Sequence, residues 1–182
     1  MKRMAGRQIA LIRGINVGRA KRVGMADLRA LVVDLGYADV STLLNSGNVV
    51  FTIPATVRGD PACRIEQAMA TRLGISARVL VFAAAELTAV VREHPLHKVA
   101  IDPSRLLVAF LANPADRERL KPLARQDWSP EALALGARVA YLWCPRGTIK
   151  SPVANAVGRV VGDAATTRNW ATTRKLHALA GE

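Results

Sequence analysis

The residues best suited to chemistry are basic, and they lie in and beside one glycine-containing loop. The loop runs from Gly14 to Gly24, with Arg13 before it and Arg19, Lys21 and Arg22 within it. Glycine lets backbone N–H groups turn outward, and a helix predicted to follow the loop would add the positive end of its dipole. Cationic side chains beside exposed N–H groups predict an anion-binding cradle.

The loop lacks the patterns of the known phosphate-binding loops. Neither GxxxxGK[ST] nor GxGxxG occurs in it, so phosphate binding here would be of an unclassified kind. A plainer interpretation stays open, in which the glycines only turn the chain and the basic side chains are solvated.

A second basic segment, residues 166–175, lies near the end of the sequence. Arg168 and Trp170 could pair with the phosphate and stack on the base of a nucleotide. We favour the alternative, a final helix that is anchored by a buried Trp170 and capped by Thr167 or Asn169.

The predicted anion-binding set draws on both basic segments and on a hairpin described below. Its members are Arg13, Asn16, Arg19, Lys21, Arg22, Ser46, Asn48, Arg168, Asn169, Trp170 and Lys175. No catalytic residue is predicted, because the carboxylates form no visible pair and no GxSxG or activated cysteine pattern occurs. His94 and His97 flank Pro95 without a third ligand nearby, so we expect no metal site, and no cofactor is predicted.

Hydrophobic periodicity gives the first half of the chain a βαββαβ order. Strands are predicted over residues 7–13, 40–44, 49–53 and 77–82, and helices over residues 25–35 and 60–73. Gly36 is expected to cap the first helix, and Asp60 with Pro61 to begin the second. Residues 45–48, Asn-Ser-Gly-Asn, are expected to supply the left-handed conformations of a hairpin turn.

The order of strands predicts where that hairpin lies. The first and second strands of a βαββαβ unit run in the same direction, so the loop after one and the hairpin after the other emerge at the same edge of the sheet. Ser46 and Asn48 should therefore lie near the basic loop. Turn formation by their side chains is favoured over contact with a ligand.

The same order recurs in the second half of the chain, after a linking helix over residues 84–92. Strands are predicted over 106–111, 132–135, 139–143 and 165–168, and helices over 115–125, 151–161 and 170–180. Ser151 is expected to cap the middle helix of these three, with Pro152 in its first turn. The sequence thus predicts an α+β fold made by tandem duplication of βαββαβ repeats, with added linking and C-terminal helices. Residues 1–83 form the first repeat, 84–104 the linking helix and turn, and 105–182 the second repeat with its final helix.

Several predicted strands are apolar at consecutive positions, which indicates sheets buried on both faces. Examples are Ile9–Ile12, Val79–Phe82 and Leu106–Leu111. A sheet with one solvated face should alternate apolar and polar residues instead. Either the two sheets pack on each other, which we favour, or the linking and final helices cover them.

Composition points to a soluble cytoplasmic protein that attracts polyanions. The 26 Lys and Arg exceed the 14 Asp and Glu, for a net charge of +12, and the natural partners are nucleic acid or nucleotides. An arginine-rich, alanine-rich composition also follows from GC-rich coding, so the charge alone does not decide. Two cysteines, Cys63 and Cys144, fit a reducing compartment, and no membrane span is predicted.

Three segments together resemble the widespread bacterial family called domain of unknown function 1697. They are RGINVGR with the following GMADLRALVVDLGY, the hairpin NSGNVVF, and TTRNWATTRKL. The resemblance spans the whole chain and implies a paired ferredoxin-like architecture, but it supplies no catalytic residue. Arg19 stands where such proteins often have glycine, and Asn45 where glutamine is common.

The leading hypothesis is a non-catalytic protein that binds nucleic acid or a nucleotide through the basic loop. An enzyme acting on a small phosphorylated substrate is the first alternative, and it requires a deep enclosed pocket. A structural or partner-binding module is the second, and it requires a contiguous exposed apolar patch. The oligomeric state is not predicted.

Overall fold

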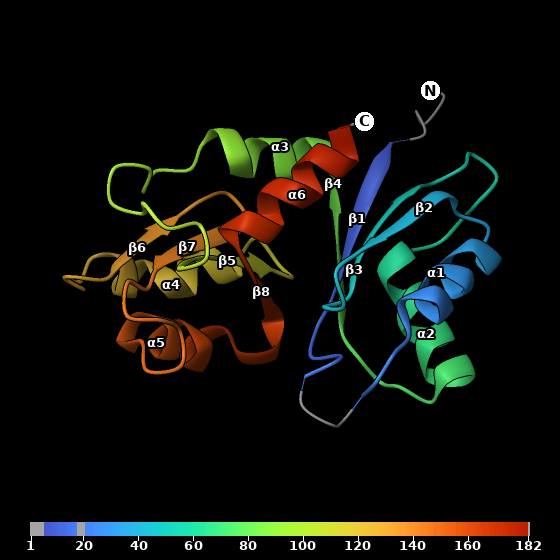
Figure 1. Ribbon diagram of the computed structural model, residues 1–182, viewed down its shortest axis with the longest axis horizontal. Helices are drawn as coiled ribbons and strands as arrows, with labels where there is room; N and C mark the ends of the chain where they lie inside the picture. The colour runs from blue at the N-terminus through green and yellow to red at the C-terminus, as the bar shows by residue number, and fades with distance from the viewer. Residues whose placement is uncertain (1–5, 18–20, 182) are drawn as a thin grey trace. The chain divides into compact units, whose positions relative to one another are not determined.

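The computed structural model describes residues 6–17 and 21–181, which form two compact units (Figure 1). One unit comprises the chain up to Leu87 together with the segment from Leu176 onward, and the other comprises Thr88–Lys175. Each unit contains one four-stranded sheet in which every pair of neighbouring strands is antiparallel. The predicted α+β class is confirmed. The division at residues 83 and 105 stays a prediction.

The first unit has the predicted βαββαβ order. Its elements are β1 (Arg7–Ile12), α1 (Met25–Asp34), β2 (Ala38–Leu43), β3 (Asn48–Thr52), α2 (Pro61–Leu73) and β4 (Val79–Ala83). The strands lie in the order β2-β3-β1-β4, so β1 is central. Helices α1 and α2 contact each other and cover one face of this sheet, where Leu28 and Met69 join Ala10 and Ile12 in a buried core (Figure 1).

The second unit repeats this plan after the helix α3 (Ala84–Arg92). Its elements are β5 (Leu106–Leu111), α4 (Asp116–Ala124), β6 (Ala132–Leu135), β7 (Val139–Trp143), α5 (Pro152–Val161) and β8 (Ala165–Asn169), and α6 (Trp170–Gly181) follows. The strand order β6-β7-β5-β8 matches that of the first unit position by position. Leu120 of α4 and Val157 of α5 pack with Ala109 and Leu142 of the sheet. The predicted tandem duplication is confirmed.

The helix ends follow the predicted local rules. Asp60 Oδ2 accepts a hydrogen bond from Cys63 N at 2.8 Å, and Pro61 occupies the first helical position of α2. Ser151 Oγ accepts from Ala154 N at 3.1 Å at the start of α5. Side-chain caps of this kind contribute about 1 kcal/mol each. Gly36, with φ +87°, ends α1 as expected.

The central strands β1 and β5 are buried on both faces, as their unbroken apolar runs predicted. On β1 the residues that alternate with the core positions, Ile9 and Leu11, are as buried as Ala10 and Ile12. On β5, Val108 and Phe110 behave in the same way. What covers the second face of each sheet stays a prediction.

The hairpin between β2 and β3 differs from its prediction in the residues that adopt left-handed conformations. Leu44 and Gly47 have positive φ, at +57° and +73°, whereas Asn45, Ser46 and Asn48 do not. Gly47 is required because a Cβ there would lie 2.8 Å from Ile15 Cδ1. The sequence prediction began the left-handed residues at Asn45, one position after Leu44, because leucine is not a residue typical of turns.

Candidate functional site

The basic loop is closed by the side chain of Asn16. Its amide Nδ2 donates to Val23 O at 2.9 Å, and its Oδ1 accepts from Val23 N at 2.8 Å. The Asn16 backbone N–H also donates to Lys21 O at 3.1 Å. Asn16 has φ +56°, a conformation that asparagine adopts more readily than most residues. These bonds bring the two ends of the loop together and fix where α1 begins.

The hairpin and the basic loop lie at the same edge of the first sheet, as the strand directions predicted. Asn16 Nδ2 donates to Asn45 O at 2.8 Å, and Ile12 N donates to Gly47 O at 2.8 Å. Asn48 Nδ2 in turn donates to Leu43 O and to Ser46 Oγ, both at 2.9 Å. Asn48 is fully buried. Turn formation is therefore the observed role of the Ser46 and Asn48 side chains, and the amide that bridges the two segments belongs to Asn16.

Lys21 and Arg22 are the basic side chains of the loop that face solvent. Both residues are exposed, and within residues 6–17 and 21–181 no hydrogen bond or ion pair engages either side chain. Arg13 is half-buried, and its backbone N–H donates to Arg78 O at 2.8 Å. Arg19 lies outside the described residues.

Helix α1 begins beside these two cations without a side-chain cap. Its N-cap is Gly24, in an extended conformation, which has no side chain to accept an N–H. The carboxylate of Asp27 folds back over this end, since a Cβ on Gly24 would lie 2.7 Å from Asp27 Oδ2. The sequence reasoning overlooked Asp27, although an acidic residue three positions after an N-cap is a recognised capping signal.

A depression of about 430 Å³ lies between the loop, the hairpin and the start of α1. It is lined by Asn16, Arg22, Val23, Gly24, Met25 and Asn45. The start of α1 and Arg22 both line it, and the Asp27 carboxylate lies beside its lining residue Gly24. Such a depression can accept an anionic group that outcompetes Asp27 for the helix terminus.

In the second unit, Arg168 is buried in the edge strand β8. It is 9% exposed, and its Nη1 donates to Thr166 Oγ1 at 2.9 Å and to Thr167 O at 2.8 Å. Burial lowers the pKa of Arg168 to about 10. Asn169 Oδ1 accepts from Thr172 N at 2.8 Å and so caps α6, which selects Asn169 from the two predicted caps.

Trp170 and Lys175 lie on α6 in different environments. Trp170 is half-buried, and its ring centroid lies 4.5 Å from that of His94. His94 also lies 5.4 Å from Tyr141, whose hydroxyl donates to Val90 O at 2.8 Å. Trp170 therefore packs within its own unit, although it is half-buried and not fully buried as the anchoring interpretation expected, whereas Lys175 is exposed. That this segment and the basic loop form one surface stays a prediction.

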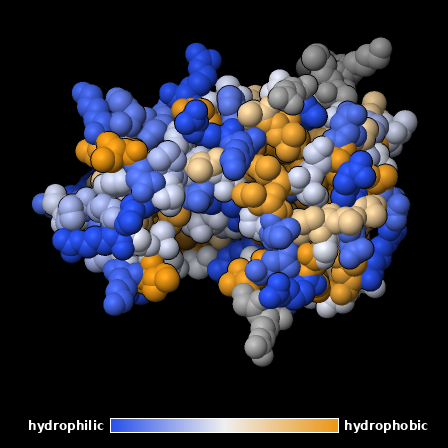
Figure 2. Space-filling model, viewed as in Figure 1, coloured by the Kyte–Doolittle hydropathy of each residue, from blue (hydrophilic) through white to orange (hydrophobic). Residues whose placement is uncertain are grey.

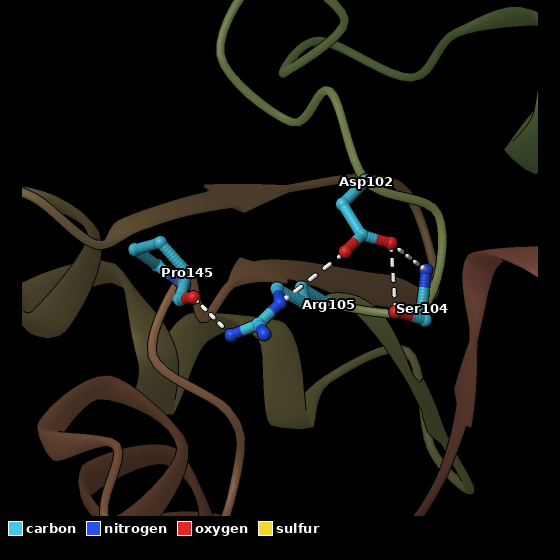
Figure 3. Close-up of polar contacts among 4 residues, drawn as sticks. All are labelled: Asp102, Ser104, Arg105 and Pro145. Atoms are coloured by element: carbon cyan, nitrogen blue, oxygen red, sulfur yellow. Dashed lines mark hydrogen bonds and ion pairs between the residues drawn. The ribbon is translucent and has the colours of Figure 1, made fainter.

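A polar cluster that sequence reasoning missed ties two loops of the second unit together (Figure 3). Asp102 Oδ1 accepts from Ser104 N at 2.9 Å and Ser104 Oγ at 2.7 Å, and its Oδ2 accepts from Arg105 Nε at 3.2 Å. Arg105 Nη1 donates to Pro145 O. The bonds from Ser104 and the charge of Arg105 lower the pKa of Asp102. The carboxylate and the guanidinium pair with each other, so this cluster holds the two loops together.

Three further features bear on binding: the surface hydropathy, membrane-spanning helices and clusters of metal ligands. On the face shown in Figure 2, hydrophobic residues are interspersed with hydrophilic ones. Among the described helices, none is long and apolar enough to cross a bilayer. Within the same residues, no group of three or more His, Cys, Asp or Glu could hold a metal ion.

Comparison with known proteins gives a family and a fold. The model of a family described as "Protein of unknown function (DUF1697)" matches residues 5–141. A solved structure titled as that of the conserved bacterial protein SP0830 from Streptococcus pneumoniae is similar to this chain, with a TM-score of 0.78 and 22% sequence identity. The match covers 98% of this chain and 99% of that one. No match exists among curated protein sequences.

Proposed function

For a chain that belongs to the DUF1697 family of proteins of unknown function, we propose a non-catalytic role in binding nucleic acid or nucleotides. The phosphate contacts are assigned to the basic loop of the first unit. The observation that carries the proposal is the position of Lys21 and Arg22, exposed and free of acidic partners among the described residues, beside the start of α1, where the N-cap Gly24 has no side chain.

The chemistry of this position suits a phosphate. A phosphate oxygen accepts hydrogen bonds from backbone N–H groups at a helix start, and a guanidinium can add a charge-assisted bond. Asn16 ties the two ends of the loop to each other and to the hairpin before any ligand binds, and such preorganisation lowers the entropy lost on binding. The net charge of +12 adds long-range attraction for a polyanion.

Two exposed aliphatic side chains beside the loop favour a ligand that also has apolar surface. Val17 is 71% exposed and Leu44 is 50% exposed. Each is adjacent in sequence to a member of the Asn16–Asn45 contact. A base or ribose offers such surface, whereas inorganic phosphate does not. This supports a nucleotide or nucleic acid as the ligand.

In the second unit the proposal assigns Lys175 to phosphate contact. The bonds described above give Arg168, Asn169 and Trp170 a positioning role, because they fix β8 and the start of α6. The proposed location is the cytoplasm, where the free thiols Cys63 and Cys144 would stay reduced.

The test is the salt dependence of binding to a labelled single-stranded oligonucleotide, measured by fluorescence anisotropy. A plot of the logarithm of the affinity against the logarithm of the salt concentration should be a falling line, and each phosphate contact should add about 0.7 to the steepness of that line. The double variant Lys21→Gln, Arg22→Gln should lose about 1.4 of that slope. Arg92→Gln with Lys98→Gln, two exposed cations of the second unit, is the matched control for net charge.

Three results would decide against the proposal. These are absence of binding at low salt, affinity that does not respond to salt, and equal loss in the two double variants. A nucleoside monophosphate that binds as tightly as the oligonucleotide would assign the site to a small ligand instead.

A further inference from the structure

A second cavity lies in the first unit, away from the basic loop, where α2 begins. Its volume is about 300 Å³, within the range of small-molecule sites. Its lining includes Gln8, Ile53, Val57, Arg58, Asp60 and Val81. Gln8 is at the start of β1 and the basic loop follows its end, so roughly 17 Å of extended strand separates the two sites.

The polar rim of this cavity carries one charge of each sign. Arg58 and Asp60 are separated only by Gly59, which has φ +93°. The Asp60 carboxylate would repel a purely anionic ligand, and the Arg58 guanidinium would repel a purely cationic one. A ligand with both charges close together satisfies both groups.

The loop that bears these charges is braced from within the unit. Arg64 donates from Nη1 to Arg58 O at 3.2 Å and from Nη2 to Leu35 O at 2.8 Å. Arg58 Nη1 donates to Ala55 O. Asp60 Oδ2 accepts from Cys63 N, and a carboxylate has lone pairs for further donors. The charges are therefore held in place before a ligand binds.

Three aliphatic side chains lie among the otherwise largely polar lining. Ile53, Val57 and Val81 are half-buried and would lose their remaining exposed surface against an apolar ligand group. Gln8 adds an amide that can both donate and accept. Among the described residues that line the cavity there is no aromatic ring, so they offer no stacking surface for a nucleobase.

The Tyr37 hydroxyl is buried outside the lining of the cavity. Tyr37 is 4% exposed, packs on Phe51 with 4.7 Å between ring centroids, and has no hydrogen-bond partner for its hydroxyl among the described residues. Burial raises the pKa of Tyr37, Arg64 opposes this rise, and Asp60 adds to it. The hydroxyl thus lies within electrostatic reach of a carboxylate that lines the cavity.

We propose that this cavity binds a small zwitterion with an aliphatic side chain, an α-amino acid or its close analogue. Its ammonium group pairs with Asp60, its carboxylate pairs with Arg58, and its side chain packs on Ile53, Val57 and Val81. The site is independent of the phosphate contacts proposed for the basic loop.

The test is a titration of the full chain with L-leucine, followed by two-dimensional ¹H–¹⁵N NMR. Saturable shifts should appear at the amides of Gln8, Gly59 and Val81 below about 10 mM ligand. N-acetyl-L-leucine lacks the ammonium group and L-leucinamide lacks the carboxylate, so each should bind at least about tenfold more weakly. Asp60→Asn keeps a good N-cap and should lower affinity for L-leucine by the same factor, as should Arg58→Gln.

Arg92→Gln and the Lys21→Gln, Arg22→Gln variant should bind L-leucine as the unmodified protein does. The proposal is overturned if L-leucine causes no saturable shift. It is also overturned if both analogues bind as well as L-leucine, or if Asp60→Asn and Arg58→Gln, with folded spectra, keep full affinity. Loss of oligonucleotide binding with retained L-leucine binding would refute only the function proposed for the loop.

Discussion

Asn16 and Asn45 lie 29 residues apart in the sequence, and the Asn16 side chain donates to the Asn45 carbonyl oxygen at 2.8 Å. With its two bonds to Val23, the same amide closes the basic loop and joins it to the hairpin of the neighbouring strands. The position of the proposed phosphate contacts therefore depends on one side chain.

Replacing Asn16 with glycine distinguishes the contribution of its side-chain amide from that of its backbone conformation. Glycine accepts φ +56° without strain but makes none of the three side-chain bonds. Asn16→Gly should lower the free energy of unfolding by about 1–3 kcal/mol, since each lost bond contributes about 1 kcal/mol. Urea denaturation measures this change. Asn16→Ala should cost more because alanine is strained at this φ, and equal costs for the two variants would contradict this role of the backbone.

Gly47→Ala should destabilise the first unit through both strain and collision. The new Cβ would lie 2.8 Å from Ile15 Cδ1 and 2.9 Å from Ile12 Cβ, at a residue whose φ is +73°. Gly74→Ala is the matched control, because Gly74 has φ +66° but no atom within 4 Å of the added Cβ. Strain alone costs about 1 kcal/mol, and Gly47→Ala should exceed that by about 1–3 kcal/mol. Thermal unfolding of both variants provides the comparison, and similar melting temperatures would be the opposing result.

Asp27→Asn should strengthen anion binding at the start of α1. The Asp27 carboxylate lies at the helix terminus that the phosphate is proposed to occupy, and removing its charge removes a competitor. The affinity for the oligonucleotide should rise about two- to fivefold at low salt, as expected for a helix-terminus charge of about 0.3–1 kcal/mol. Asp34→Asn, at the other end of α1, controls for the change in net charge. An equal rise in both variants would show that the effect is not local.

The stability of the second unit should fall as the solution is acidified below pH 6.5. Burial between Trp170 and Tyr141, with a smaller effect of His97, lowers the pKa of His94 from its ordinary value of 6.5. The unfolded chain therefore binds a proton more readily than the folded one, and stability is lost as pH falls through the unfolded pKa. His94→Phe keeps an aromatic ring and should flatten this part of the profile. Urea midpoints at pH 5 and pH 8 provide the measurement. If the midpoint of the variant falls between pH 8 and pH 5 as much as that of the unmodified protein, groups other than His94 cause the effect.

Features that depend on nearby residues could be predicted from the sequence. The caps Asp60 and Ser151, each followed by proline, are local patterns, and both were found where expected. The unbroken apolar residues of β1 and β5 predicted burial on both faces because a solvated face would require alternation. The shared edge of loop and hairpin followed from strand direction alone.

Features that depend on distant partners could not be predicted. Nothing in the sequence distinguishes Asn16 from any other asparagine in a loop, and only the folded chain brings it next to Asn45. Arg168 looked available for a ligand, yet it is buried, because the position of β8 in the folded sheet decides its exposure. The cavity at Arg58 and Asp60 joins residues of β1 and β4 and of the segment after β3 with the start of α2, so no single segment predicts it.

The central claim is that phosphate binds where Arg22 and the start of α1 meet. Its most direct test is chemical-shift mapping of the ¹⁵N-labelled chain with a single-stranded oligonucleotide. The account predicts the largest shifts at the backbone amides of Arg22, Met25 and Ala26 and at the side-chain amide of Asn16, reversed by added salt. Shifts confined to other surfaces, or none at low salt, would contradict it.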